Sequence, residues 1–283
     1  MDLLEVKHIA KHYKNFDLQD ISFSLPAGYI MGYVGQNGAG KTTTLNIINH
    51  LIQSASGTVT LDGRTYDDAP IPYRDQIGYI GDASYFPANL TLRHIRGILR
   101  DFYPSFDPAR FDRYVADWNL PVKDRIKSFS RGMKVKLMFA SVLSRDTRLL
   151  VLDEATNGLD PVVRRQILEL LQEYISDGSR SVLFSTHILE DLEQIADYVC
   201  FIDKGKQIFC EPKEDLIERY LVAKGGPKDL TPELSRHLIG ITKNDFGFEA
   251  LYDTDCGIVL PPELVTDRPS IDQIMFHMIQ KMR

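Results

Sequence analysis

The chain has 283 residues, of which 43% are hydrophobic and 25% are charged, and its formal net charge is −6. These values are typical of a globular protein large enough for one main domain and a smaller second one. The acidic balance argues against general nucleic-acid binding. No apolar run reaches the ~18–20 residues of a membrane span, and the N-terminus lacks the basic region of a secretion signal, so we expect neither a span nor secretion.

The first eighty residues predict strands of a partly antiparallel sheet. Apolar and polar residues alternate at 6–9 and 21–25, as in half-buried strands. An apolar run at 29–34 predicts a buried strand. Further strands are expected at 57–61, ahead of an Asp62-Gly63 turn, and at 77–80.

A glycine-rich segment between the strand at 29–34 and a helix predicts a phosphate-binding loop. It reads Gly-Gln-Asn-Gly-Ala-Gly-Lys-Thr-Thr and matches the P-loop pattern G-x-x-x-x-G-K-[ST]. Its glycines let successive N–H groups face one anion, Lys41 can reach the β- and γ-phosphates, and Thr42 can bind Mg²⁺. The predicted nucleotide-binding residues are Gly35, Asn37, Gly38, Ala39, Gly40, Lys41, Thr42 and Thr43. The following helix should carry Leu45, Ile48 and Ile52 on one face.

The segment from 92 to 143 is predicted to be helical. One helix should carry Leu92, Ile95, Leu99 and Phe102 on one face, a second should start at Asp107-Pro108, and a third should follow Ser130. Residues 91–145 hold twelve Lys and Arg against five Asp, a surplus of seven positive charges. This surplus indicates either a solvated basic face or a surface that meets phosphates, acidic lipid headgroups or a partner.

Alternating strands and helices then complete an α/β fold. Strands are expected at 149–152, 181–184, 199–202 and 207–209, with a helix capped by Asp160-Pro161 and another at 188–198. This order predicts a P-loop NTPase: a mostly parallel sheet with an antiparallel β edge and an inserted helical subdomain. We expect an ATP-binding domain at 1–211, with its core at 1–82 and 146–211 and the helical insertion at 83–145.

Residues 212–283 predict a small C-terminal accessory domain that ends in a helix with a capping box at Ser270. The segment holds more apolar side chains than so small a unit can easily bury, so some should pack on the main domain or on a second copy. Cys200, Cys210 and Cys256 are too widely spaced for a disulfide framework or a metal site, so we expect buried, reduced thiols.

The apolar strand at 149–152 ends in an acidic pair, Asp153-Glu154. Opposite a P-loop, Asp153 can hold Mg²⁺, usually through water, and Glu154 can polarise the attacking water. Positioned charges and an oriented nucleophile are sufficient for phosphoryl transfer. The acidic pair and the P-loop together therefore predict phosphoryl transfer to water, with a nucleotide as the phosphate donor.

Several further segments resemble the ATP-binding subunits of ABC transporters over roughly residues 3–210. Ser130-Arg131-Gly132-Met133 is similar to the family's signature loop, and residues 157–160 (Asn-Gly-Leu-Asp) are similar to its D-loop. His187 stands where the family has its switch histidine, and Tyr13 where it stacks an aromatic ring on adenine. Two positions depart from the pattern: Arg131 replaces a signature glycine, and Asp82, a weaker Mg²⁺ candidate, stands where the Q-loop glutamine is expected.

The resemblance implies an ATPase that works as a dimer on a separate integral membrane subunit. The signature residues Ser130, Arg131, Gly132 and Met133 would act on ATP bound to the partner subunit, while Glu154 and His187 would be catalytic. The signature form is most similar to that of bacterial ABC-2-type exporters of peptides or antibiotics. The implied location is cytoplasmic, on the inner face of the cell membrane, with no nucleic acid as a partner. An importer motor and a soluble ABC ATPase acting on ribosomes or DNA are the alternatives.

Overall fold

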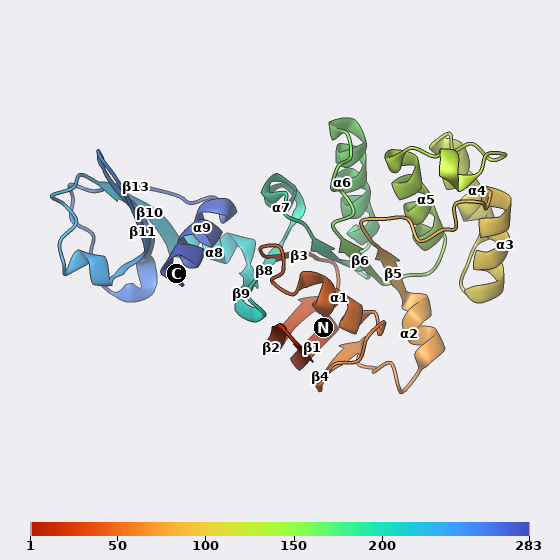
Figure 1. The fold of residues 1–283 in the computed structure, drawn as a ribbon, viewed down its shortest axis with the longest axis horizontal. Helices are drawn as coiled ribbons and strands as arrows, with labels where there is room; N and C mark the ends of the chain where they lie inside the picture. Colours follow the sequence, from red (N-terminus) through yellow and green to blue (C-terminus); the bar gives the residue numbers. More distant parts are fainter. Residues whose placement is uncertain (1, 283) are drawn as a thin grey trace.

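The computed structural model describes residues 2–282, which contain a nine-stranded sheet and a four-stranded sheet. Figure 1 shows the larger sheet in the middle, a block of helices at one end of the long axis and the smaller sheet at the other. This arrangement confirms the α/β class and the mixed sheet predicted from the sequence.

The large sheet has the strand order β4-β1-β2-β9-β8-β3-β7-β6-β5. The strands β5, β6, β7, β3 and β8 run parallel to one another, whereas β1 pairs antiparallel with β2 and β4, and β8 with β9. The bounds are β1 Asp2–Tyr13, β2 Phe16–Pro26, β3 Ile30–Val34, β4 Ser56–Leu61, β5 Ile77–Ile80, β6 Leu149–Asp153, β7 Ser181–Ser185, β8 Tyr198–Asp203 and β9 Lys206–Pro212.

Both faces of the parallel strands are covered, which explains their continuous apolar sequence. In β6, Leu150 and Leu152 join the apolar cluster formed with the helices α5 (Arg131–Leu143), α6 (Pro161–Ile175) and α7 (Leu189–Ile195). Leu149 and Val151 join the cluster formed with α1 (Lys41–Ile48), β1 and β2 on the opposite face. The two-residue period of a strand thus separates one apolar run into two cores.

The helices that cover the large sheet are α1 Lys41–Ile48, α2 Pro70–Gln76, α6 Pro161–Ile175 and α7 Leu189–Ile195. Two of them are shorter than predicted. Helix α1 ends before Ile52, because Asn49 donates its side-chain amide to the Leu45 carbonyl and His50 has a φ of 51°. Helix α7 ends at Ile195, and the predicted helical residue Tyr198 instead starts β8.

Three α-helices lie between β5 and β6 in the chain and form the helical block of Figure 1. They are α3 Leu92–Phe102, α4 Pro108–Asp117 and α5 Arg131–Leu143, with a short 3₁₀ turn, η1 Ile126–Ser128. Asp107 caps α4 as predicted. The predicted apolar face of α3 buries Leu92, Ile95 and Leu99, whereas Phe102, at the last position of the helix, is 77% exposed.

The C-terminal segment forms the second sheet, in the order β11-β12-β10-β13, together with α8 and α9. The bounds are α8 Lys213–Arg219, β10 Tyr220–Gly225, η2 Leu234–Arg236, β11 Leu238–Asn244, β12 Gly247–Asp253, η3 Thr254–Cys256, β13 Val265–Asp267 and α9 Ile271–Lys281. The predicted capping box joins Ser270 and Gln273 at the start of α9.

The second sheet has its own small core, yet it also packs on the main body. Phe248 and Tyr252 belong to the local core. Ile274 and Met275 instead join the cluster that includes Leu192 of α7. Part of the C-terminal apolar surface is therefore buried against the larger sheet's helices, which was one of the two predicted outcomes.

The three cysteines have free thiols, but they are not all buried as expected. Cys200 is buried and lies opposite Cys210 in the β8–β9 pair, whereas Cys256 is exposed. Cys256 is the last residue of the short η3 turn that follows β12.

Candidate active site

The P-loop is a tight turn between β3 and Lys41, the first residue of α1. A Cβ on Gly35 would lie 2.3 Å from the carbonyl oxygen of Ile202, so only glycine fits beneath the turn. Gly40 has a φ of 111°, and a Cβ there would lie 2.9 Å from the Phe16 ring. These glycines aim the first amides of α1 outward, where a helix N-terminus attracts anions.

A cavity of about 470 Å³ opens over this turn. Its lining brings the predicted phosphate-binding residues together with the predicted catalytic acid: Asn15, Phe16, Asn37, Gly38, Gly40, Lys41, Thr42, Thr43 and Glu154. Gly35 and Ala39 are buried and shape the turn from below.

The aromatic residue at this cavity is Phe16, which the sequence analysis missed. Tyr13 is 47% exposed and does not line the cavity, and its ring centroid lies 6.5 Å from that of Phe16. The two residues pair across the β1–β2 hairpin, so Phe16 shares the same tip. The signal that could have found it is an aromatic residue three positions after Tyr13, at the start of the next strand.

Lys41, Glu154 and His187 lie within reach of one another at the end of the parallel strands. The Lys41 Nζ donates to the Gly35 carbonyl at 2.8 Å and lies 3.6 Å from Oε1 of Glu154. The Nδ1 atom of His187 lies 3.3 Å from Oε2 of Glu154. Glu154 has a φ of 53°, a conformation that is uncommon for a residue other than glycine and that recurs at functional sites.

Asp153 ends β6 next to Glu154, and its side chain is buried. Burial raises the pKa of Asp153, while the nearby Thr42 and Ser185 hydroxyls and Lys41 oppose this shift. Among residues 2–282, Oδ1 of Asp153 and Oγ of Ser185 have no hydrogen-bond partner. Buried polar atoms normally have hydrogen-bond partners. A ligand bound at this place would supply the partners that these two oxygens lack.

These oxygens fit a magnesium ion bound together with a nucleotide. No group of three or more His, Cys, Asp or Glu side chains is placed to hold a metal within the described residues. Mg²⁺ does not need such a group, because it is commonly bound by one or two carboxylates together with substrate phosphates. Asp153 can supply the carboxylate, and Thr42 a hydroxyl.

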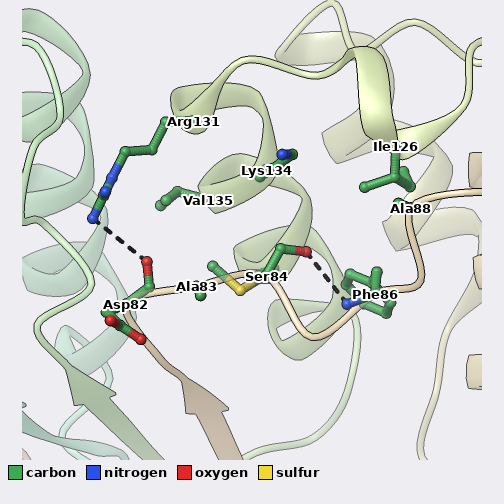
Figure 2. Close-up of a pocket in the computed structure, with 10 residues that line it drawn as sticks. Asp82, Ala83, Ser84, Phe86, Ala88, Ile126, Arg131, Lys134 and Val135 are labelled. Atoms are coloured by element: carbon green, nitrogen blue, oxygen red, sulfur yellow. Dashed lines mark hydrogen bonds between the residues drawn. The ribbon is translucent and has the colours of Figure 1, made fainter.

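Asp82 lies outside the P-loop cavity and lines a different one of about 420 Å³, where β5 meets the helical block. Figure 2 shows the Arg131 side chain pointing across this cavity to Asp82. A guanidinium nitrogen of Arg131 donates to the Asp82 main-chain carbonyl at 3.4 Å. The Arg131 side chain also lies against Gly158, so it contacts two loops of its own chain.

Residues 130–133 form the N-cap and the first turn of α5, and none of them lines the P-loop cavity. Ser130 is the N-cap of α5 and accepts a hydrogen bond from the Met133 amide at 3.2 Å. A Cβ on Gly132 would meet only Val163, at an ordinary 3.8 Å. The signature-like residues of one chain therefore do not line the P-loop cavity of that chain.

A third cavity of about 390 Å³ lies between the large sheet and the helical block. Leu51 and Tyr85 at its edge are 60% and 49% exposed, and the Arg145 guanidinium stacks 3.6 Å from the centre of the Tyr103 ring. Within residues 2–282 no helix is both long and apolar enough to cross a membrane.

Known proteins are similar to this chain in sequence and in fold. Residues 18–157 match the family model described as ABC transporter. The Bacillus subtilis ABC-type transporter ATP-binding protein EcsA is 32% identical over 257 residues, which cover 88% of this chain and all of EcsA. The Streptococcus pyogenes lantibiotic transport ATP-binding protein SrtF is 31% identical, covering 73% of this chain and 89% of SrtF.

Solved structures agree with the sequence comparisons. One described as the ATP-binding subunit of an ABC transporter superposes with a TM-score of 0.70 at 28% identity, covering 76% of this chain and 92% of that one. A nucleotide-free ATP-binding cassette from an ABC transporter has a TM-score of 0.64 at 16% identity, which supports the shared fold.

Proposed function

This chain belongs to the ABC transporter family as an ATP-binding subunit that hydrolyses ATP in transport, and we propose that it is the motor of an exporter. The observation that best supports the catalytic part is the Lys41–Glu154–His187 arrangement over a P-loop. The domain boundaries at 82/83, 145/146 and 211/212 are part of the same proposal.

In the proposed mechanism Glu154 orients the attacking water and accepts its proton. Lys41 stabilises the charge on the β- and γ-phosphates, and His187 hydrogen-bonds the γ-phosphate and holds the Glu154 carboxylate in place. Thr42 and Asp153 would hold Mg²⁺, which when bound neutralises charge on the β- and γ-phosphate oxygens. Phe16, together with Tyr13, would stack on the adenine.

We propose further that hydrolysis requires a dimer. This proposal is supported by the absence of Ser130 and Gly132 from the lining of the P-loop cavity of the same chain, which leaves them to contact the ATP of a second subunit. ATP would then lie between one P-loop and the partner's signature loop. Binding would close the dimer, and hydrolysis would reopen it.

The membrane subunit is proposed to dock at the third cavity, beside Leu51 and Tyr85. Exposed apolar side chains that gather at a cavity are typical of a protein interface. The site lies next to the Asp82 loop and the Arg131 contact, so docking there could reach the signature loop. Such docking would hold the chain at the inner face of the membrane.

A peptide or antibiotic-like cargo is supported by the names of relatives. They include a lantibiotic transport protein, a linearmycin resistance protein and a Nod factor export protein. Their names describe those proteins, and they motivate a test of the same cargo class here.

The test is transport in inside-out membrane vesicles that contain this chain and the membrane subunit that co-purifies with it. An exporter should accumulate a labelled antibiotic peptide inside such vesicles when ATP is added. Vesicles with Glu154→Gln are the control and should not. Accumulation only in right-side-out vesicles would show import and overturn the proposed direction.

A further inference from the structure

Asp191 is a buried carboxylate that the proposed mechanism does not use. It lies in the first turn of α7, four residues after His187, and is only 1% exposed. A buried carboxylate is costly unless charged or polar partners compensate it. Its partners therefore indicate what it holds in place.

Two side chains from different elements bind the two oxygens of Asp191. Nε of Arg164, on α6, donates to Oδ1 at 2.5 Å. The hydroxyl of Thr156 donates to Oδ2 at 3.0 Å. Thr156 is itself buried and lies two residues after Glu154, at the start of the 157–160 turn.

The loop after β6 and the loop after β7 are thus joined at several points. At the sheet end, the Glu154 amide donates to the Ser185 carbonyl at 3.0 Å. Next, His187 contacts the Glu154 carboxylate. Farther along, Asp191 binds Thr156. These contacts fix the position of His187 relative to Glu154.

Apolar packing holds the other side of α7. Leu192 and Ile195 share a cluster with Ile274 of α9, and Oε1 of Glu193 accepts from the Ile271 amide at 3.1 Å. This packing attaches α7 to α9, whereas Asp191 connects α7 to α6 and to the loop after β6.

We infer that Asp191 is a positioning residue for hydrolysis: through Thr156 and Arg164 it aligns the His187 loop with Glu154 and the 157–160 turn. This inference rests on the roles proposed above for Glu154 and His187. The requirement is geometric, because small misplacements of catalytic groups can cost ~10²-fold in rate.

The test compares steady-state ATP hydrolysis of the full chain and its variants. Asp191→Asn keeps an oxygen for Thr156 but removes the charge that faces Arg164. We expect kcat to fall about 10- to 100-fold, with KM for ATP changed less than about two-fold. Glu169→Gln is the matched control, because it breaks an exposed pair with Arg165 on the same α6 and should leave both constants unchanged.

A double variant separates positioning from a general structural effect. If Asp191 acts through His187, then Asp191→Asn should cost little in a His187→Ala background. Independent effects that multiply in the double variant would overturn the inference, as would a wild-type kcat in Asp191→Asn.

A second pair of variants covers the case in which Asp191→Asn does not fold. Thr156→Val removes the hydroxyl at similar volume, and Thr156→Ser retains it. We expect the valine variant to lose kcat and the serine variant to keep it; equal rates would contradict the inference. If Glu154→Gln itself hydrolyses ATP normally, the proposed function fails first. If Glu154→Gln loses activity as expected but the Asp191 and Thr156 variants keep the wild-type kcat, only this inference fails.

Discussion

The imidazole of His187 lies 3.3 Å from the carboxylate of Glu154, although 33 positions separate the two residues in the chain. They follow adjacent parallel strands, β7 and β6, whose carboxyl ends meet at one edge of the sheet. His187 does not cap α7, whose N-cap is Ile188 without a side-chain cap bond. A role at the reaction centre therefore explains its position better than a role in the helix.

Replacing Glu154 with Gln should lower kcat for ATP hydrolysis about 10²–10⁴-fold and leave ATP binding intact. The amide keeps the size of the side chain but can neither accept the proton nor orient the water as a charge does. Steady-state kinetics and a fluorescent-nucleotide titration measure the two effects. Lys41→Ala is the control for the binding measurement, because loss of the cation at the phosphates should abolish ATP binding itself. A wild-type rate in Glu154→Gln would rule out this carboxylate as the base.

His187→Ala should reduce kcat with little effect on ATP affinity or on Tm. The ring is 46% exposed and supplies no cap to α7, so its loss should cost little stability. Removing a donor to the transferring phosphate weakens the transition state specifically. Melting curves and kinetics on the same preparation test this expectation. A lower Tm with an unchanged rate would instead assign His187 a structural role.

Phe16→Ala should weaken ATP binding more than Tyr13→Ala does. Only Phe16 lines the P-loop cavity, and stacking of a base on an aromatic ring contributes about 1–3 kcal/mol. Titration of both variants with ATP and with inorganic triphosphate separates the adenine contribution from the phosphate contribution. A larger loss in Tyr13→Ala would return the adenine contact to Tyr13.

Ile274→Ala should destabilise the whole chain by about 2–5 kcal/mol, because the side chain is fully buried in the cluster shared by α7 and α9. Urea unfolding measures this loss. Phe276→Ala is the control on the same helix: Phe276 is 44% exposed, and its truncation should cost far less. Similar losses in both would show that α9 is not attached through its buried face.

A chain that ends at Pro212 should still bind ATP but should dimerise more weakly. It retains every residue that lines the P-loop cavity and loses α9 together with the second sheet. It also exposes Leu192 and Ile195, so its Tm should be lower than that of the full chain. Analytical ultracentrifugation checks the association. Equally tight dimers would exclude the C-terminal segment as an assembly element.

The sequence alone predicted the P-loop, the acidic pair and the succession of strands along residues 1–211. These features are local: Gly40 needs a positive φ, Asp160 and Ser130 cap the helices that follow them, and the short apolar run at β6 has the length and composition typical of a buried strand. Each is specified by neighbours within a few positions, so the residue pattern predicts them.

Tertiary packing decided what no local pattern contains. Packing places Phe16, and not Tyr13, at the P-loop cavity, and it brings the Arg131 side chain to the Asp82 carbonyl. It also brings Asp191 into contact with Thr156 and Arg164. It also attached the C-terminal helix to α7. These contacts connect residues far apart in the chain, and they depend on the positions in which packing of the two cores holds the strands and helices.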